Sequence, residues 1–347
     1  MAIIDKPTDY FNTKLTTGTG SSQAVTGLGF QPDWIWGKRR DSTGNNSLFD
    51  SVRGITKGLE SNSTGAEFTS TDYYSSFDSD GFTIAAGASG AGNGSGQTAV
   101  QWCWKAGTSV SGDTTGSGTL KTYTGSVNTT SGFSIIKYTG NGTAGHTIPH
   151  HLGVAPSAIF VKKLNELGDW SSYHSVLGNA GYMRLNNTNA FATASTYWNN
   201  TSPTSSVFTT GTTGNINGSG STYIAYCFAE KQGYSKFGSY TGNGSTDGTF
   251  VYLGFKPAWV VIKRSSAVSD WHALDNKRAG FNADNDYLKL NQPDTEGTDG
   301  DRVDFLSNGF KLRHATGNLN ESGNTFIYMA FASEPFTTST GVCATAR

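Results

Sequence analysis

Short stretches of consecutive apolar residues, each preceded by a glycine and a proline, dominate the hydrophobic pattern of the chain. The run GFQPDWIWGKR at 29–39 is one of them, and related runs stand at 153–163 and 254–264. Stretches of this length that are rich in β-branched and aromatic residues favour strands buried on both faces over helices. Each run therefore predicts a core strand whose proline lies at the strand start, where a missing N–H is tolerated.

A second apolar stretch follows each of these runs at a nearly constant distance. The three stretches are AVQWCWKA at 99–106, YIAYCFAE at 223–230 and FIYMAFAS at 326–333. From the proline of the first run to the last aromatic residue of the second, the separation is 72, 72 and 74 residues. Self-similarity at a fixed spacing is the signature of repeated structural units. The chain is therefore predicted to contain three tandem copies of one domain.

Helical patterns are scarce, and shorter alternating segments and polar turns surround the two apolar strands of each copy. Two such strands per copy fit a two-layer packing of sheets. The predicted fold is all-β, with three tandem β-sandwich repeats of jelly-roll-like form. The predicted parts are an N-terminal arm (1–9), repeat 1 (10–106), a linker (107–131), repeat 2 (132–234), repeat 3 (235–336) and a C-terminal tail (337–347).

The two junctions between repeats differ in composition. Residues 107–131 are rich in Gly, Ser and Thr, which is typical of a flexible linker. At the second junction the closing run at 223–230 leads almost directly to Phe237. We therefore expect repeats 2 and 3 to dock rigidly and repeat 1 to be more freely placed.

Charge is low and balanced, with a formal net charge of −1 and 15% charged residues among 347. This balance gives no steering field toward nucleic acid or an anionic membrane surface. The start MAIIDKPTDYF lacks the charged and apolar regions of a secretory signal, and no apolar run reaches about 18 residues. We expect no nucleic-acid partner and no membrane insertion.

Two groups of residues were considered as metal ligands. His146, His150 and His151 cluster in repeat 2 only, without a matching Cys or carboxylate, whereas a structural zinc site is closed by four ligands. No metal site is predicted there. Acidic residues and glycines alternate over 294–304, but their spacing does not match a calcium-binding loop of the EF-hand type. A solvated acidic loop is the favoured interpretation, and a loosely bound calcium ion is the alternative; no other cofactor is expected. The candidate calcium ligands are Asp294, Asp299 and Asp301.

Catalytic motifs were sought without success in the sequence: a nucleophile elbow, an HExxH helix, a phosphate-cradling loop and a paired-carboxylate signature. What recurs in the three copies is scaffold, so the sequence predicts a protein that is not an enzyme, with no catalytic residues. Aromatic residues are the remaining candidates, because their rings stack on sugars or anchor protein interfaces. Four that are unique to their copies are predicted to bind a ligand: Tyr73, Tyr74, Tyr197 and Trp198. Trp170 and Trp271 recur after an aspartate and are interpreted as core residues.

Longer motifs carry a family resemblance. They include KYTGNGT, IPHHLGVAPSAIFVKK and GYSKFGSYTGNGSTDGTFVYLGFKPAWVVIKR, with IDKPTDYFNTKL at the start and AFASEPFTTSTG near the end. Over almost its whole length the chain resembles uncharacterised repeat domains of tail and other virion proteins from marine bacteriophages, including those of cyanobacteria. The resemblance implies a structural virion component near the host-contacting end and brings no catalytic residues. Larger relatives append such domains to long fibres, but this chain has no coiled coil or β-helical stalk.

The sequence therefore predicts a non-enzymatic bacteriophage virion structural protein exposed on the particle surface, of the tail or tail-fibre type, that serves host adhesion or assembly. The expected partners are other virion proteins, further copies of the chain, and a host cell-surface glycan or protein. At least one terminal segment is expected to dock on another virion subunit. Two alternatives stay open: a capsid-decorating protein, and a carbohydrate-binding or glycan-degrading depolymerase.

Overall fold

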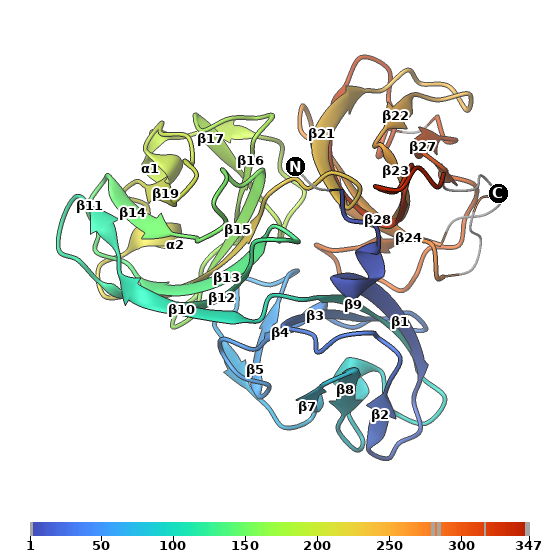
Figure 1. Cartoon of the computed structure of the whole chain (residues 1–347), viewed down its shortest axis with the longest axis horizontal. Coiled ribbons are helices and arrows are strands. Elements are labelled where there is room, and N and C mark those ends of the chain that lie inside the picture. Colours follow the sequence, from blue (N-terminus) through green and yellow to red (C-terminus); the bar gives the residue numbers. More distant parts are fainter. Residues whose placement is uncertain (1–2, 279–281, 283–285, 316, 344–347) are drawn as a thin grey trace.

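Three β-sandwich lobes, one for each repeat, stand around a common centre in the computed structural model (Figure 1). The structure describes residues 3–278, 282, 286–315 and 317–343. Each lobe pairs one large antiparallel sheet with one three-stranded sheet. The prediction of an all-β fold with three sandwich-like repeats is confirmed. Within the described residues, no helix is long and apolar enough to cross a membrane.

Repeat 1 opens with a short 3₁₀ helix. Its elements are η1 (Pro7–Asp9), β1 (Phe11–Thr17), β2 (Gln23–Val25), β3 (Trp34–Arg39), β4 (Ser47–Asp50), β5 (Lys57–Glu60), β6 (Phe68–Thr69), β7 (Tyr74–Asp78), β8 (Gly81–Ile84), η2 (Ser89–Ala91) and β9 (Thr98–Trp104). The large sheet has the order β1-β9-β3-β4-β5-β6 and the small sheet β2-β8-β7. The proline-run strand β3 pairs antiparallel with the closing strand β9. The two strands predicted from the sequence are therefore neighbours in one sheet.

Repeat 2 has the largest sheet. Its elements are β10 (Thr108–Asp113), β11 (Thr115–Gly116), β12 (Thr122–Asn128), β13 (Phe133–Thr139), β14 (His146–Pro149), β15 (Ala158–Lys163), β16 (Ser171–His174), β17 (Gly181–Arg184), β18 (Ala192–Thr193), α1 (Ser195–Trp198), β19 (Val207–Thr210), α2 (Gly214–Asn217) and β20 (Thr222–Phe228). The sheet orders are β10-β12-β13-β20-β15-β16-β17-β18 and β11-β14-β19. The proline-run strand β15 again pairs with the closing strand β20.

Repeat 3 repeats this arrangement with fewer strands. Its elements are β21 (Ser235–Thr241), β22 (Phe250–Tyr252), β23 (Phe255–Arg264), β24 (Trp271–Asp275), β25 (Leu288–Lys289), β26 (Val303–Leu306), β27 (Gly309–Leu312) and β28 (Thr325–Pro335). The sheet orders are β21-β28-β23-β24-β25 and β22-β27-β26. The pairing of β23 with β28 matches that of β3 with β9 and of β15 with β20.

The segment 107–131, predicted as a flexible linker, is instead part of the large sheet of repeat 2. Strand β12 pairs with β10 on one side and with β13 on the other. Tyr123 and Val127 on β12 are buried in the core of repeat 2. The linker prediction was wrong because much of the Gly, Ser and Thr content belongs to the strands β10 and β12, whose backbones are hydrogen-bonded rather than free.

Both faces of each large sheet are buried, which explains the consecutive apolar residues of the proline runs. On β3, Trp34 and Trp36 point into a central core that all three repeats share, while Ile35 points into the core of repeat 1 alone. Phe160 and Val261 lie in the same central core and are 6% and 4% exposed. The prediction that these strand centres are buried is confirmed. The large sheets face one another and the small sheets lie outside (Figure 1).

An aromatic triangle marks the centre of the assembly. The last aromatic residues of the three closing strands are Trp104, Phe228 and Phe331, and all are at most 1% exposed. Their ring centroids lie 6.4 Å apart for Trp104 and Phe228, 5.6 Å for Trp104 and Phe331, and 5.9 Å for Phe228 and Phe331. Equivalent residues that contact one another in a triangle define a pseudo-threefold axis. The chain is therefore a closed ring of three repeats.

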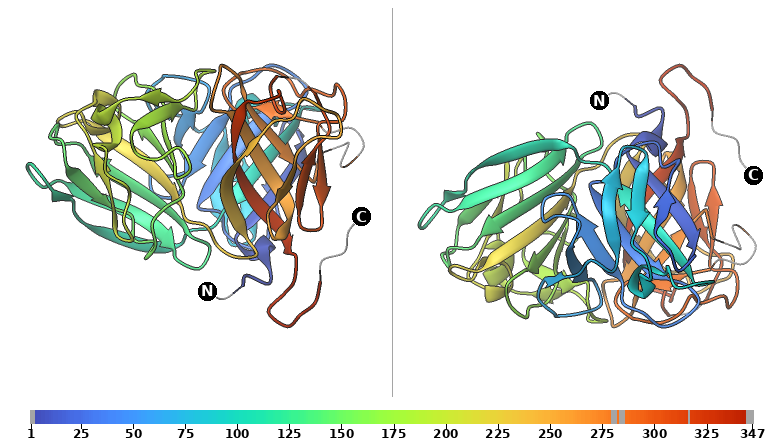
Figure 2. Two further views of the ribbon diagram at one scale, coloured as in Figure 1. Left: turned by 90° about the horizontal axis from the view of Figure 1, so that it is seen from above. Right: turned by 90° about the horizontal axis from the view of Figure 1, so that it is seen from below.

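The two ends of this ring differ. Both terminal segments lie at the same end, as the edge-on views show (Figure 2), and this end is named the terminal end. There the N-terminal arm is bonded to the segment that joins repeats 2 and 3, with Ile4 N donating to Gln232 O at 3.2 Å, and to the tail, with Ser339 N donating to Asp5 Oδ1 at 2.7 Å. The strands β3, β15 and β23 run away from it toward the opposite end, which is named the loop end.

Candidate functional site

The interfaces between repeats, here called the 1–2, 2–3 and 3–1 seams, use the residues that recur in the sequence. The lysine at the tenth position of each proline run, Lys38, Lys162 or Lys263, is at most 1% exposed and donates to two backbone carbonyls. One carbonyl belongs to its own repeat and the other to the neighbouring repeat. The bonds to the neighbour are Lys162 Nζ to Thr64 O at 2.9 Å, Lys263 Nζ to Thr188 O at 3.0 Å and Lys38 Nζ to Pro293 O at 2.9 Å. The recurring lysines therefore join the repeats at the loop end.

Burial of these ammonium groups has an electrostatic cost. Desolvation lowers the pKa of Lys38 and of Lys162 to about 8 and that of Lys263 to about 7. Carbonyl oxygens carry only partial negative charge, so they offset the loss of hydration incompletely. The three lysines act as structural donors whose charge is destabilised by the fold.

Backbone hydrogen bonds repeat around the ring in the same way. A loop N–H donates to the carbonyl that also accepts from the lysine in each seam: Gly168 N to Thr64 O, Ser269 N to Thr188 O, and Gly44 N to Pro293 O, at 3.0, 2.9 and 2.8 Å. Repeat 1 thus docks through the same bonds as repeats 2 and 3. The expectation that repeat 1 is more freely placed was wrong, because the ring closes between the first and third repeats.

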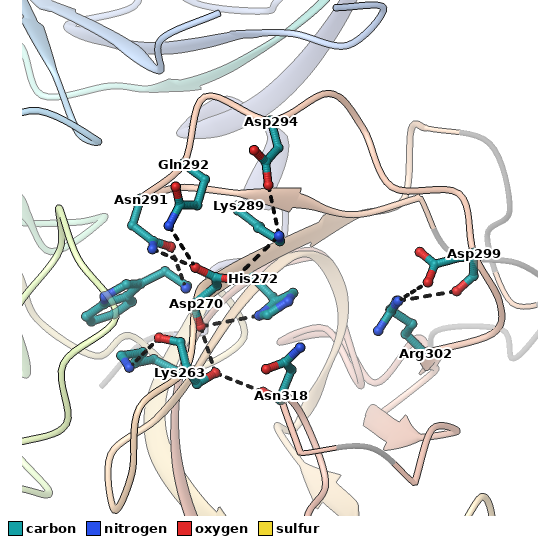
Figure 3. Close-up of polar contacts among 12 residues, drawn as sticks. Lys263, Asp270, His272, Lys289, Asn291, Gln292, Asp294, Asp299, Arg302 and Asn318 are labelled. Atoms are coloured by element: carbon teal, nitrogen blue, oxygen red, sulfur yellow. Dashed lines mark hydrogen bonds and ion pairs between the residues drawn. The ribbon is translucent and has the colours of Figure 1, made fainter. Parts of the chain in front are cut away.

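The recurring Asp-Trp pairs also belong to the seams. In repeat 3, Asn291 accepts from Trp271 N at 2.8 Å and donates to Asp270 Oδ1 at 2.8 Å, as Figure 3 shows. The indole Nε1 of Trp271 then donates to Arg184 O of repeat 2 at 3.0 Å. The same geometry holds in repeat 2, where the indole of Trp170 donates to a carbonyl of repeat 1 at 2.9 Å. These tryptophans are buried, as predicted, and each crosses a seam.

Repeat 1 carries an asparagine in place of that tryptophan. Asn46 occupies the equivalent position, since it follows the same loop, and its Nδ2 donates to Lys289 O at 3.2 Å and to Gln292 O at 2.9 Å. Its N–H is held by Asn62, whose Oδ1 accepts at 2.8 Å. The residue of repeat 1 that is equivalent to the recurring tryptophans is therefore Asn46. A side-chain amide there makes the bonds that an indole makes elsewhere.

Near the terminal end, the 1–2 seam contains a buried charge pair. Asp50 and Arg53 of repeat 1 have fully buried side chains and form an ion pair. Tyr226 of repeat 2 donates its hydroxyl to Asp50 Oδ2 at 2.7 Å. Arg53 also reaches Glu67 at 3.3 Å. A carboxylate, a guanidinium and an aromatic donor thus satisfy one another across this seam.

The 3–1 seam has the equivalent set. Asp275 and Arg278 of repeat 3 pair at 2.7 Å, and Trp102 of repeat 1 donates its indole N–H to Asp275 Oδ2 at 2.9 Å. Burial alone would raise the pKa of Asp275, but Arg278, the indole and two backbone N–H groups outweigh it and lower the pKa. Glu296 adds a link, because it bonds Arg278 at 3.0 Å and Arg40 of repeat 1 at 2.7 Å.

The 2–3 seam departs from this pattern. The strand register places His174, Leu177 and Met329 at the positions of the aspartate, the arginine and the aromatic donor. His174 Nε2 and Tyr328 O lie 3.2 Å apart, and burial lowers the pKa of His174 to about 4. Ala158 stands where the other repeats have tryptophan, and a cavity of about 20 Å³ lies beside it. The seam is neutral and loosely filled at this point.

The predicted ligand-binding residues of repeat 1 do not form an exposed platform. Tyr74 is the first residue of β7 and is fully buried in the core of repeat 1. Tyr73 is half-buried and packs on Phe49 and Phe68, with ring centroids 5.1 and 5.5 Å apart. Burial raises the pKa of both phenols. Their uniqueness to repeat 1 reflects how that repeat fills the space between its own sheets.

The predicted residues of repeat 2 are buried as well. Tyr197 and Trp198 end the one-turn helix α1 and are 5% and 1% exposed. Tyr197 stacks on Tyr182 with ring centroids 3.6 Å apart, and Trp198 packs edge-on against Phe208. The predicted residues of repeat 1 and those of repeat 2 therefore do not form a common site. Occurrence in a single copy did not identify surface residues, because a residue can be unique to one repeat and still fill its core.

The candidate metal ligands are engaged one by one. His146 lies between Asn217 and Thr114, while His150 contacts a backbone carbonyl and His151 contacts Tyr123. In the acidic stretch, Asp294 pairs with Lys289 and Asp299 pairs with Arg302, both shown in Figure 3. The charge of Asp301 contributes to raising the pKa of Arg313. Among the described residues, no group of three or more His, Cys, Asp or Glu side chains is arranged to hold a metal ion.

One recurring asparagine was missed in the sequence. The motif Asn-x-Ser-Gly-x-Thr stands at 93–98, 217–222 and 320–325, and its asparagine is fully buried in each copy. In repeat 2, Asn217 Oδ1 accepts from Asn141 N at 3.0 Å and its amide donates to Thr143 O and Gly211 O. The asparagine thus fixes the Thr-Gly-x-Gly loop that faces it. Its fixed offset from the closing strand could have revealed it.

Fold and seams together define a class: a single-chain, pseudo-threefold ring of β-sandwich repeats. The chain matches the family described as Domain of unknown function (DUF7483) over residues 6–335, and it belongs to this family. The matched range begins just before η1 and ends with β28, so it takes in all three repeats. No curated protein and no solved structure matches the chain. The unit that the family defines is therefore the whole ring.

Proposed function

We propose that the protein is a non-enzymatic structural component of a bacteriophage particle, exposed on the virion surface, where it serves host adhesion or assembly as part of a tail or tail fibre. The proposal rests on one observation: the polar residues that recur in the three repeats serve structural hydrogen bonds. The recurring lysines, asparagines and Asp-Trp pairs form hydrogen bonds that join the repeats or fix their loops. A chain built in this way is a rigid platform, which suits a particle component.

The viral setting rests on the sequence resemblance to repeat domains of phage virion proteins. Partners of this proposal are other virion proteins, further copies of the chain, and a glycan or protein of the host surface. A pseudo-threefold ring fits a threefold position in a protein shell as well as a trimeric fibre. For this reason a capsid-decorating role is the second candidate.

Particle composition tests the proposal. Virions of the phage that encodes this chain would be purified on a density gradient, analysed by mass spectrometry and labelled with antibody for electron microscopy. We expect the protein in the particle band, with label on the tail; label spread over the capsid would favour the decorating role. A protein found only in the soluble fraction of the lysate, with label absent from particles, would overturn the proposal.

A further inference from the structure

Repeat 3 carries two exposed aromatic side chains on the outer face of its small sheet. Phe250 and Tyr252 on β22 are 45% and 53% exposed, whereas Val251 between them is buried. Residues two apart on a strand project from the same face, about 6.7 Å apart at 3.3–3.4 Å per residue. The two rings therefore form a short aromatic strip that faces solvent.

The sister strands show that packing does not require these rings. Val25, Ile148 and Val251 are equivalent, since each pairs with the buried phenylalanine of its small sheet. The flanking residues are Ala24 on β2 and Thr26 directly after it, Thr147 and Pro149 on β14, and Phe250 and Tyr252 on β22. The inward residue is apolar in all three repeats, but only repeat 3 has aromatic residues outside.

Tyr252 lines a groove of about 460 Å³ at the terminal end of repeat 3. The segment that joins repeats 2 and 3 also lines the groove, with Glu230, Lys231 and Gln232. Lys236 Nζ donates to Tyr252 O at 3.1 Å and lies 5.3 Å from the centroid of its ring. This contact places the ammonium group of Lys236 beside the ring, so the groove combines an aromatic side chain with polar ones.

A pyranose ring matches such a groove. Its C–H face packs on an aromatic ring, and its hydroxyl groups at the ring edge exchange hydrogen bonds with amide, carboxylate and ammonium groups. The volume falls within the range of small-ligand sites, which is about 300–1,000 Å³. A purely apolar peptide side chain would leave Glu230 and Gln232 without new partners, which disfavours it.

We propose that the groove between Tyr252 and Glu230–Gln232, extended by Phe250, is a binding site for a carbohydrate chain. For its biological setting the site rests on the proposed role in host adhesion, and it names the class of ligand for that role. Tyr252 is the stacking residue, Gln232 and Glu230 bind hydroxyl groups, and Phe250 contacts the next sugar along the strand.

The test uses the full chain and defined probes. Maltohexaose, cellohexaose and chitohexaose would be titrated by calorimetry, and an array of bacterial surface oligosaccharides would be probed in parallel. We expect a Kd below about 1 mM for at least one probe. Tyr252→Thr, which installs the residue of repeat 1, should weaken binding at least tenfold, and Phe250→Thr, which installs that of repeat 2, should weaken it several-fold.

Leu167→Thr is the matched control, because it removes an exposed apolar side chain (75% exposed) at the loop end of repeat 2 and should leave binding unchanged. Binding that survives Tyr252→Thr, or no binding to any probe or array spot, would overturn the site. The proposed function can fail separately: sugar binding that depends on Tyr252 in a protein absent from particles would leave the site standing and overturn the virion role.

Discussion

The 2–3 seam and the other two seams solve the same packing problem with different chemistry. The 1–2 and 3–1 seams bury a carboxylate, a guanidinium and an aromatic donor, whereas the 2–3 seam has a histidine, a leucine and a methionine there. The backbone bonds at the loop end are the same in all three. The backbone and lysine contacts therefore define the ring, while the buried ion pairs are an addition that one seam lacks.

Chain connectivity sets the 3–1 seam apart from the 2–3 seam, although the 1–2 seam also carries an ion pair and only residues 105–107 separate β9 from β10. Only residues 229–234 separate β20 of repeat 2 from β21 of repeat 3, so the 2–3 seam is held by a short covalent link. The 3–1 seam joins the two ends of the chain without such a link, and it carries Arg40, Arg278, Asp275 and Glu296. Charge complementarity adds orientation and specificity where the covalent chain supplies neither.

The largest effect is expected from breaking one charge pair. Arg53→Leu leaves Asp50 buried without its cation, and we expect a loss of about 3–5 kcal/mol in the free energy of unfolding, measured by urea titration. The triple change Asp50→His, Arg53→Leu and Tyr226→Met copies the 2–3 seam and should recover most of that loss. A triple variant as unstable as Arg53→Leu alone would show that the two kinds of seam are not interchangeable.

A slightly smaller loss is expected from the apolar contact of the 2–3 seam. Phe160 packs edge-on against Phe228 and against Trp271 of repeat 3, both at 6.3 Å between ring centroids. Phe160→Ala should cost about 3 kcal/mol through lost burial and an enlarged cavity. Val176→Ala on the exposed surface of the same repeat is the control and should change stability by less than about 0.5 kcal/mol. An unchanged melting temperature for Phe160→Ala would reject the shared core.

The lysine contacts predict a pH dependence. The folded-state pKa of Lys263 is about 7 and lies below the usual value of 10.5, so the unfolded chain binds more protons between about pH 7 and 10. The contribution of Lys263 to stability therefore rises with pH in this window and is lost as the pH falls through 7. Relative to Lys263→Met, the parent protein should gain about 1–2 kcal/mol from pH 7 to pH 9. A difference that does not change with pH would place the charge of Lys263 in a well-solvated setting.

The smallest expected effect has the opposite sign. Ala158→Val adds two methyl groups beside the cavity of the 2–3 seam and should stabilise the protein by about 0.5–1 kcal/mol. Ala225→Val adds the same groups to the fully buried core of repeat 2 and should destabilise it by about 1–3 kcal/mol. Equal effects of the two changes would mean that the 2–3 seam is as tightly packed as the interior of a repeat.

The core strands could be predicted from the sequence because their information is local. A proline run such as GFQPDWIWGKR reports burial on both faces, and the constant spacing to the closing strand reports a common topology. The covering layer that buries the second face could not be identified. Trp34 and Ile35 are both apolar residues of one run, and the sequence does not show which face each occupies. Trp34 faces the other repeats, and Ile35 faces the small sheet of repeat 1.

The seam contacts and the exposure of single residues could not be predicted from the sequence, for a different reason. The partners of Lys38 and Asn46 lie about 250 residues away along the chain, and most are backbone carbonyls, which leave no mark on residue type. The prediction of ligand-binding aromatic residues named Tyr74 and Trp198, which are buried, and did not name Tyr252, which is exposed. Aromatic residues serve both places equally well, so only three-dimensional packing separates them.

The aromatic triangle on the axis has an evolutionary consequence. In a trimer of separate identical chains, every residue at the axis occurs three times, so a change of one ring changes all three at once. Here the axis is filled by one indole and two phenyl rings, Trp104, Phe228 and Phe331. Because three units share one gene, each can accept mutations that its sisters would not tolerate. The fused chain can therefore specialise one lobe at a time while the other two preserve the assembly.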